Sequence, residues 1–191
     1  IAALCRNCVL LSNGTISKID ITENVISTYF ATHHNLNSEK VWEHNTAPGN
    51  EIVKLLAIRA VEVGGKKGNI FDISKPVGIE MEYEVSKPDN ILWHGLNLYN
   101  EEGINLFDSH SVSAKWYQKP HPIGTFKITA WIPGNLLNEG KVIINAAIFN
   151  HKTSVIHVYE KEVIAFDVTD YFQDALNLSR GSSTGRFPGV L

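Results

Sequence analysis

The fold of this chain is decided by one stretch, Thr125-Phe-Lys-Ile-Thr-Ala-Trp-Ile132, Pro133-Gly-Asn-Leu-Leu-Asn-Glu-Gly140 and Lys141-Val-Ile-Ile-Asn-Ala-Ala-Ile-Phe149. Apolar and polar residues alternate in its first and last parts, and a loop rich in Gly, Pro and Asn joins them. Because successive side chains of a β-strand point to opposite sides, this pattern predicts two strands, each with one face in a core. The other face of the first strand carries a tryptophan among polar residues, which is typical of a binding surface.

The same alternation continues through the chain after residue 50. It predicts strands at 52–63, 76–86, 91–100, 104–109, 125–132, 141–149, 155–159 and 163–170. Turn residues such as Gly64-Gly65 and Lys87-Pro-Asp-Asn90 separate them. Short strands with almost no helix predict an all-β fold, an antiparallel two-sheet β-sandwich, and we expect the jelly-roll type.

The first 40 residues follow a different pattern. Residues 7–11 and 15–19 predict two strands joined by a turn at Ser12-Asn-Gly14. Thr22 predicts the N-cap of a helix with one apolar face, and the residues of that face are Val25, Ile26, Tyr29 and Phe30. This strand-turn-strand-helix unit has an apolar side and no partner within itself. Because residues 33–46 are polar, we expect an appendage at 1–32, a linker at 33–46 and the sandwich at 47–191.

Composition excludes several classes of protein. The 191 residues carry a formal net charge of -3, and 43% of them are hydrophobic, which fits one globular domain with an appendage. Lys and Arg form no basic stripe, so we expect no nucleic-acid partner. No apolar run approaches the roughly 20 residues of a membrane-spanning helix. Because Ile1-Ala-Ala-Leu-Cys5 is neither a signal peptide nor a translation start, we expect the chain to begin inside a longer polypeptide.

The outward faces of three predicted strands carry the candidate binding residues. If these strands share a sheet, its exposed face combines aromatic rings with amide, hydroxyl and amine groups. That is the chemistry a sugar needs, because pyranose C–H faces stack on aromatic rings while fixed polar groups take the hydroxyls. The candidates are Trp131, Asn97, Tyr99, Lys127, Asn145, Thr129 and Trp93.

Each of the main candidates has an expected role on this face. We expect Trp131 to stack on a sugar ring, Asn97 and Asn145 to bind hydroxyls, and Lys127 to meet an anionic cap. Exposed aromatic residues are also typical of protein interfaces, so the alternative is that the same face docks another subunit and binds no sugar.

Three glutamates, Glu80, Glu82 and Glu84, share one face of a predicted strand. Alternate residues of a strand lie about 7 Å apart, which falls within the carboxylate spacing of inverting glycosidases. Catalytic pairs, however, flank the scissile bond from separate elements. The row therefore favours an edge strand protected by charge, and a glycosidase stays the less favoured alternative.

No other motif predicts catalysis or a cofactor. Cys5-Arg-Asn-Cys8 has the spacing of half a zinc site, but no second pair follows, so we expect ordinary buried cysteines and a reducing cytoplasm. The eight histidines include no pair at His-x-x-x-His spacing, and we expect no metal. The contiguous Asp108-Ser-His-Ser111 cannot form a hydrolase triad on a strand. We expect a non-enzymatic chain without a cofactor.

Several stretches together resemble one protein family in order and spacing. They are Ala47-Pro-Gly-Asn-Glu51, Phe71-Asp-Ile73, Ile79-Glu-Met-Glu-Tyr83, Leu98-Tyr-Asn-Glu-Glu-Gly103, Ile132-Pro-Gly-Asn-Leu-Leu-Asn-Glu-Gly140, Ile156-His-Val158 and Pro188-Gly-Val190. From about Trp42 onward the chain is similar to the C-terminal domain of Wzt-type ATP-binding subunits of O-antigen polysaccharide ABC transporters. The first 32 residues resemble the end of the nucleotide-binding domain of such subunits, although Ile19-Asp-Ile21 stands where the family usually has a glycine.

The resemblance implies a function and a set of partners. It implies a carbohydrate-binding sandwich that recognises the non-reducing end of lipid-linked O-antigen polysaccharide and so confers specificity on the exporter. The implied partners are the membrane-spanning transporter subunit and a second copy of the chain in a homodimer. The implied location is cytoplasmic, peripheral to the inner membrane. The ATPase motifs would lie upstream, so this chain is not expected to hydrolyse ATP by itself.

Overall fold

The structure is a computed structural model that describes residues 5–12, 14–22, 24–25, 28–29, 37–112 and 115–169. Strands make up nearly all of its regular structure, and none of the described helical residues belongs to a helix long and apolar enough to cross a membrane. The strands are β1 (Asn7–Ser12), β2 (Thr15–Ile21), β3 (Glu39–Val41), β4 (Val53–Glu62), β5 (Ile70–Asp72), β6 (Val77–Val85), β7 (Trp93–Asn100), β8 (Asn105–His110), β9 (Gly124–Ile132), β10 (Gly140–Asn150) and β11 (Val155–Thr169).

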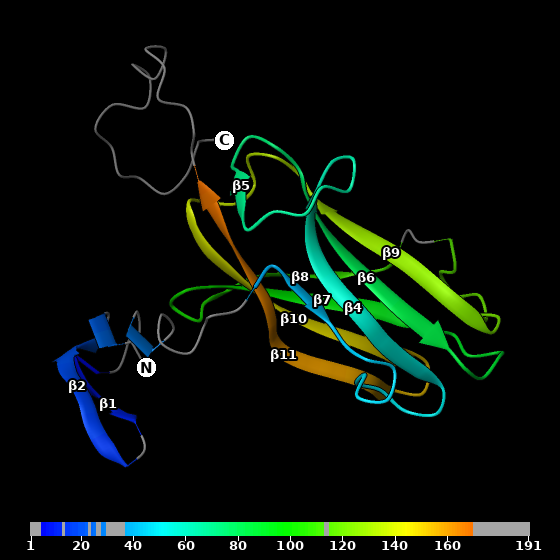
Figure 1. The fold of residues 1–191 in the computed structure, drawn as a ribbon, viewed down its shortest axis with the longest axis horizontal. Coiled ribbons are helices and arrows are strands. Elements are labelled where there is room, and N and C mark those ends of the chain that lie inside the picture. The colour runs from blue at the N-terminus through cyan, green and yellow to red at the C-terminus, as the bar shows by residue number, and fades with distance from the viewer. Residues whose placement is uncertain are drawn as a thin grey trace.

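Two sheets face each other in a sandwich (Figure 1). One has five strands in the order β5-β11-β10-β7-β8, and the other has four in the order β3-β4-β6-β9. All neighbours are antiparallel except the short parallel pair of β5 and β11. The predicted all-β, two-sheet sandwich is confirmed. Because β7–β8 and β10–β11 stay together as hairpins of one sheet, the strand order is closer to immunoglobulin-like sandwiches than to the expected jelly roll.

The core follows the alternation read from the sequence. Val142, Ile144, Ala146 and Ile148 of β10 point inward and are fully buried against the inner residues of the facing sheet, which include Ile79 and Met81. Burying such side chains stabilises a fold by about 1.5–3 kcal/mol each. The period of two therefore predicts correctly which face of each strand makes the core.

One long strand replaces the last two predicted ones. β11 pairs with β10 on both sides of an irregularity between Ile144 and Ala146. At this point Glu162 has a φ of 49°, and its backbone N–H donates to Asn145 Oδ1 over 2.7 Å. The side chain of Asn145 thus holds a β-bulge in place. Such bulges bend a strand, and this one directs the second half of β11 toward residues 37–41 and β5.

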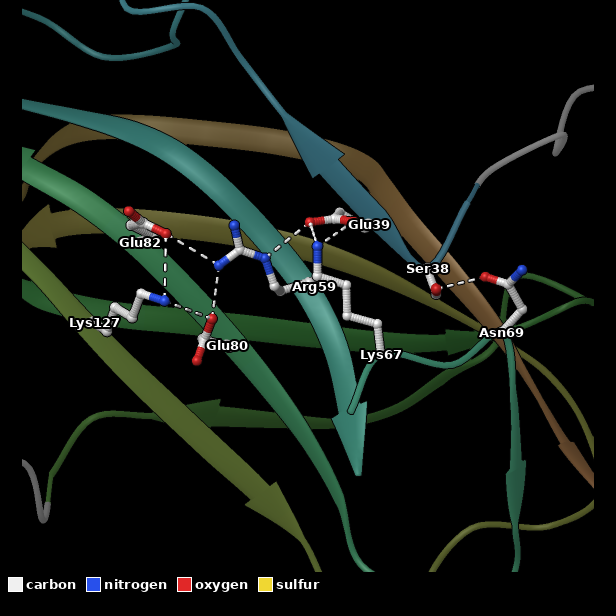
Figure 2. A network of polar contacts seen from close by, with 8 residues as sticks. All are labelled: Ser38, Glu39, Arg59, Lys67, Asn69, Glu80, Glu82 and Lys127. Carbon is white, nitrogen blue, oxygen red and sulfur yellow. Dashed lines mark hydrogen bonds and ion pairs between the residues drawn. The ribbon is translucent and has the colours of Figure 1, made fainter. Parts of the chain in front are cut away.

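Part of the predicted linker at 33–46 closes one edge of the sandwich. Ala165 N–H of β11 donates to the carbonyl of Asn37 over 3.2 Å, whereas β3 just beyond it pairs with β4 of the other sheet. Between them Ser38 is buried, and its hydroxyl donates to Asn69 Oδ1 over 2.6 Å (Figure 2). Residues 37–41 are therefore part of the sandwich, although they precede the boundary expected at residue 47. A three-residue strand has too few positions to show an alternation, which is why the sequence did not reveal it.

The loop at 133–140 shapes the fold. A Cβ at Gly134 would lie 2.2 Å from the carbonyl oxygen of Ser74, so only glycine permits this close approach of two backbones. Asn135 has a φ of 63°, and its N–H donates to the carbonyl of Ile73 over 2.7 Å. Leu137 is buried in the core. The loop thus joins the sheets near β5, as its turn residues indicate.

A network of charges crosses the outer face of the four-stranded sheet (Figure 2). The guanidinium of Arg59 on β4 bonds to Glu39, Glu80 and Glu82 over 3.0, 2.7 and 3.0 Å. Lys127 of β9 lies 3.5 Å from Glu80, and Lys67 lies 2.6 Å from Glu39. The glutamate row therefore belongs to β6, a central strand paired with β4 and β9, and the prediction of an edge strand is wrong. Basic neighbours balance the negative charge of the glutamates, so the row can lie on a central strand.

The N-terminal strands form the predicted hairpin. The described residues that follow, among them Thr22 and Val25, are helical, and Ile26 and Phe30 lie outside the described residues. The hydroxyl of Thr22 donates to the carbonyl of Cys5 over 2.6 Å, so it ties this helical residue to the segment just before β1. Cys5 is exposed and Cys8 half-buried, which corrects the expectation of buried cysteines.

One face of the hairpin exposes a row of aliphatic side chains, which are Val9, Leu11, Ile16, Ile19 and Ile21.

We expect Arg59→Met to lower the free energy of unfolding by about 2–4 kcal/mol, because it leaves three neighbouring carboxylates without their shared cation. Urea unfolding followed by circular dichroism measures this loss. Lys67→Met is the matched control, and it should cost no more than about 1 kcal/mol because the exposed Lys67 pairs at the surface. Equal losses for the two variants would show that Arg59 has no special role.

Histidines inside the sandwich make its stability depend on pH. Burial, together with the neighbouring His121, lowers the pKa of His94 to about 3, and burial also lowers the pKa values of His121 and His157. These groups are neutral in the folded chain but take up protons near pH 6.5 once unfolded. Stability is therefore complete above that pH and is lost progressively as the pH falls toward the folded pKa.

We expect the free energy of unfolding to fall between pH 7 and pH 5, with a contribution of about 2 kcal/mol from His94 alone. Urea titrations at several pH values measure the slope. His94→Gln should flatten it by about 1.4 kcal/mol per pH unit, whereas Thr125→Ala, an exposed position that carries no titratable group, should not. A wild-type slope in the His94→Gln variant would contradict the assignment.

Candidate binding surfaces

The seven candidate residues divide between the two sheets. Trp93, Asn97 and Tyr99 lie on β7 and Asn145 on β10, in the five-stranded sheet. Lys127, Thr129 and Trp131 lie on β9, at an edge of the four-stranded sheet. The expectation of one shared face is therefore wrong. The loop at 133–140 carries the chain from one sheet to the other, whereas a single face would need it to be a hairpin.

The candidates on the five-stranded sheet are largely engaged by their neighbours. Asn97 Nδ2 donates to Asp108 Oδ1 over 2.7 Å, and Asn145 is buried while it holds the bulge. Trp93 stacks on His151, with ring centroids 4.2 Å apart and planes 10° apart. Hydrogen bonds from Asn105 and Asn97 lower the pKa of Asp108, so its carboxylate stays charged. Asn145 in particular has a structural role, which leaves it no exposed amide for a sugar.

The candidates on β9 form a second surface, which we call the β9 surface: Lys127, Thr129 and Trp131 with Gly78. Trp131 is 49% exposed. Gly78 is its direct partner on β6, and a Cβ added there would lie 2.9 Å from Cζ3 of the indole. Because Gly78 has no side chain, the indole of Trp131 can pack against the backbone of β6. The hydroxyl of Thr129 has no hydrogen-bond partner among the described residues.

The charge of Lys127 is already balanced. Lys127 lies 3.5 Å from Glu80 and 3.6 Å from Glu82. In the network of Figure 2 the three cations Arg59, Lys67 and Lys127 face the three carboxylates Glu39, Glu80 and Glu82, so their sum is zero. The surface therefore has no excess positive charge for an anionic cap, which removes the argument for that role of Lys127.

The same network bears on the glycosidase alternative. Burial raises the pKa of Glu80, but the hydrogen bond from Arg59 and the charges of Lys127 and Arg59 outweigh it and hold that pKa below its usual value. A glycosidase needs one carboxyl group with a raised pKa as its general acid. Glu82 shares Arg59 with Glu80, and Glu84 pairs with His44 over 2.6 Å. The row has the geometry of an ion-pair network and lacks that of an acid-base pair.

A cavity of about 400 Å³ opens where the two sheets part, at the edge formed by β8 and β9. We call it the edge cavity. Its lining includes the inward side chains of Ile79, Met81, Ile128 and Ala130 from the four-stranded sheet, and those of His94, Leu96, Ser109 and Ser111 from the other side. Thr129 and Trp131 border it from β9, and His110 borders it from β8.

The sequence did not predict a site from the inward polar residues of the edge cavity. Ser109 stands opposite Leu96 in the β7–β8 ladder, so it points toward the core, and His94 points the same way. A polar residue at an inward position of the alternation is the sign that could have revealed them. For Asp108-Ser-His-Ser111, the contiguous order argued against a hydrolase triad. It did not show which of these side chains point into the sandwich.

The described residues contain no group of three or more His, Cys, Asp and Glu side chains placed to hold a metal ion. The cavity lining offers two imidazoles and several hydroxyls but no carboxylate. Its chemistry is that of hydrogen bonding to a neutral ligand.

No protein family model matches this chain, and no curated protein is similar to it. Among solved structures, the crystal structure of the C-terminal domain of Wzt is similar, at 14% identity and a TM-score of 0.56 over 73% of this chain and 85% of that chain. This likeness supports a fold like that of the Wzt C-terminal domain, and at such identity it shows the fold alone.

Two further structures match at 10% identity, over 68% of this chain and 100% of theirs. They are a CARDB domain from Pyrococcus furiosus in complex with di-metal ions and a Niemann-Pick type C2 protein from Japanese carpenter ant. Their TM-scores of 0.38 are too low to carry an argument.

We expect Gly78→Ala to displace the indole of Trp131, because the new methyl group would occupy space that the ring now fills. The indole N–H resonance of Trp131 in a ¹⁵N–¹H spectrum, assigned with Trp131→Phe, should shift. The free energy of unfolding should change by only about 1 kcal/mol, since the ring moves toward solvent. Gly68→Ala is the control, because its nearest neighbour lies at an ordinary 3.4 Å. An unmoved Trp131 resonance in Gly78→Ala would disprove this packing.

Proposed function

We propose that this chain is a glycan-recognition module without catalytic activity. In its specific form, it binds the non-reducing end of lipid-linked O-antigen polysaccharide and gives an ABC exporter its substrate specificity. Two independent lines support the proposal. The sequence resembles the C-terminal domain of Wzt-type subunits, and the fold is similar to that of the Wzt C-terminal domain.

The single observation that carries the proposal is the position of Trp131. Its indole is half exposed and rests against Gly78, so binding would cost little side-chain freedom. Beside it lies the hydroxyl of Thr129, which has no hydrogen-bond partner within the described part of the chain. An aromatic ring next to a free hydroxyl meets the two needs of a pyranose, a surface for its C–H face and a partner for its hydroxyls.

This placement revises the roles of the candidates. Trp131 stacks on a sugar ring, and Thr129 binds a hydroxyl of it. Lys127 contributes N–H donors without net charge, because Glu80 and Glu82 balance it. Trp93, Asn97, Tyr99 and Asn145 lie on the other sheet and so do not contact the same sugar residue.

The N-terminal hairpin supports the exporter context in the same proposal. Its exposed aliphatic face is of the kind that packs against protein. We propose that residues 1–32 are the end of a nucleotide-binding domain and that this face packs within that domain. The subunit would then act as a homodimer with the membrane-spanning transporter subunit, on the cytoplasmic side of the inner membrane.

We expect Trp131→Ala to weaken binding of the cognate O-polysaccharide by about 5- to 150-fold, which corresponds to about 1–3 kcal/mol for a lost aromatic contact. Isothermal titration with a panel of purified O-polysaccharides measures the affinity, and circular dichroism confirms the fold. Tyr159→Ala is the matched control, because Tyr159 is an exposed aromatic residue of the five-stranded sheet. If Tyr159→Ala loses binding while Trp131→Ala retains it, the site lies on the other sheet. If no polysaccharide binds the wild-type chain, the proposal fails.

A further inference from the structure

The edge cavity has two walls of opposite chemistry. On the four-stranded sheet, Ile79 and Met81 are fully buried and Ile128 half-buried, and all three are aliphatic or thioether side chains. On the five-stranded sheet and directly after β8, the wall carries His94, Ser109 and Ser111. A ligand between these walls must therefore present one apolar edge and one edge that makes hydrogen bonds.

The polar wall holds hydrogen-bonding capacity that the protein does not use. His94 is 6% exposed, and its Nε2 atom has no hydrogen-bond partner in the described part of the chain. This atom has no exposed surface, so a ligand in the cavity does not reach it. The hydroxyl of Ser109 is likewise unpaired among the described residues. Ser111 Oγ accepts the backbone N–H of His94 over 2.9 Å and retains its own proton to donate.

The volume of the edge cavity limits the size of the ligand. Small-molecule sites have volumes of about 300–1,000 Å³, and a cavity of about 400 Å³ lies at the small end of this range. It has room for one sugar ring and not for a chain of them. Because Thr129 and Trp131 border the cavity, a glycan on the β9 surface has a direct way into it.

We infer that the edge cavity binds a single 6-deoxyhexose residue. The hydroxyls of the ring bond to the hydroxyls of Ser109 and Ser111, and the C6 methyl group lies against Ile128 and Ala130. A hexose with a hydroxyl at C6 places that group against the apolar wall, where no partner exists for it. This inference rests on the proposed glycan-binding function and names the class of sugar.

The test compares sugars that differ only at C6. The probes are four pairs, fucose with galactose and rhamnose with mannose, each in the D and L forms. Binding to the full chain is followed by the shifts of the backbone amides of Ser109, Ser111 and Ala130 in ¹⁵N–¹H spectra. In at least one pair the deoxyhexose should bind fivefold or more tightly than its hexose, which is the effect of burying one unpaired hydroxyl.

Two variants and a control test the walls separately. Ser109→Ala removes a hydroxyl and should weaken the preferred deoxyhexose about fivefold or more. Ile128→Thr places a hydroxyl on the apolar wall and should reduce the preference over the hexose. Thr125→Ala, an exposed position at the other end of β9, should leave both affinities unchanged.

The outcomes separate this inference from the proposed function. If O-polysaccharide binding depends on Trp131 but no monosaccharide shifts the cavity amides, the cavity assignment is overturned and the proposed function stands. If hexose and deoxyhexose bind equally, the 6-deoxy preference is overturned. If neither polysaccharide nor any monosaccharide binds, both fail.

Discussion

The long strand β11 determines where this sandwich is closed and where it is open. Its bulge at Glu162, held by Asn145, turns its second half toward Asn37 and β5, so that one edge is sealed by backbone hydrogen bonds. At the opposite edge, β8 and β9 each end their own sheet, and a cavity lies between them. An edge strand has unused backbone groups and room beside it. The proposed ligand site therefore lies at the edge that β11 does not reach.

The Arg59 network limits what can bind nearby. It ties β3, β4, β6 and β9 together and cancels the charges of the glutamate row. What remains on the β9 surface is a ring, a hydroxyl and a balanced ammonium group. Affinity must then come from stacking and hydrogen bonds, since no net charge attracts an ion. This favours a neutral, hydroxyl-rich ligand over an anionic one.

The alternation of residues predicted the strands and their buried faces, but not their partners. A period of two says which side of β9 faces the core, and nothing about whether β10 lies beside it or in the opposite sheet. For that reason Trp131 and Asn145 were expected together and are found apart. The strand β3 escaped notice because Glu39-Lys-Val41 is too short to show a pattern. The β11 bulge was expected as a gap between two strands, because a local irregularity in sequence does not reveal whether a strand ends or bends.

The most specific part of the family resemblance lies in the loop at 133–140, and the structure gives the first half of that loop an architectural role. Gly134 packs against the backbone of Ser74, and Asn135 bonds to the backbone of Ile73. A resemblance concentrated in such a loop transfers the fold and leaves the ligand open. The ligand has to be sought where local pattern and fold disagree, because such conflicts are typical of functional sites. In this chain the disagreement is His94 and Ser109, polar side chains turned inward where the pattern calls for apolar ones.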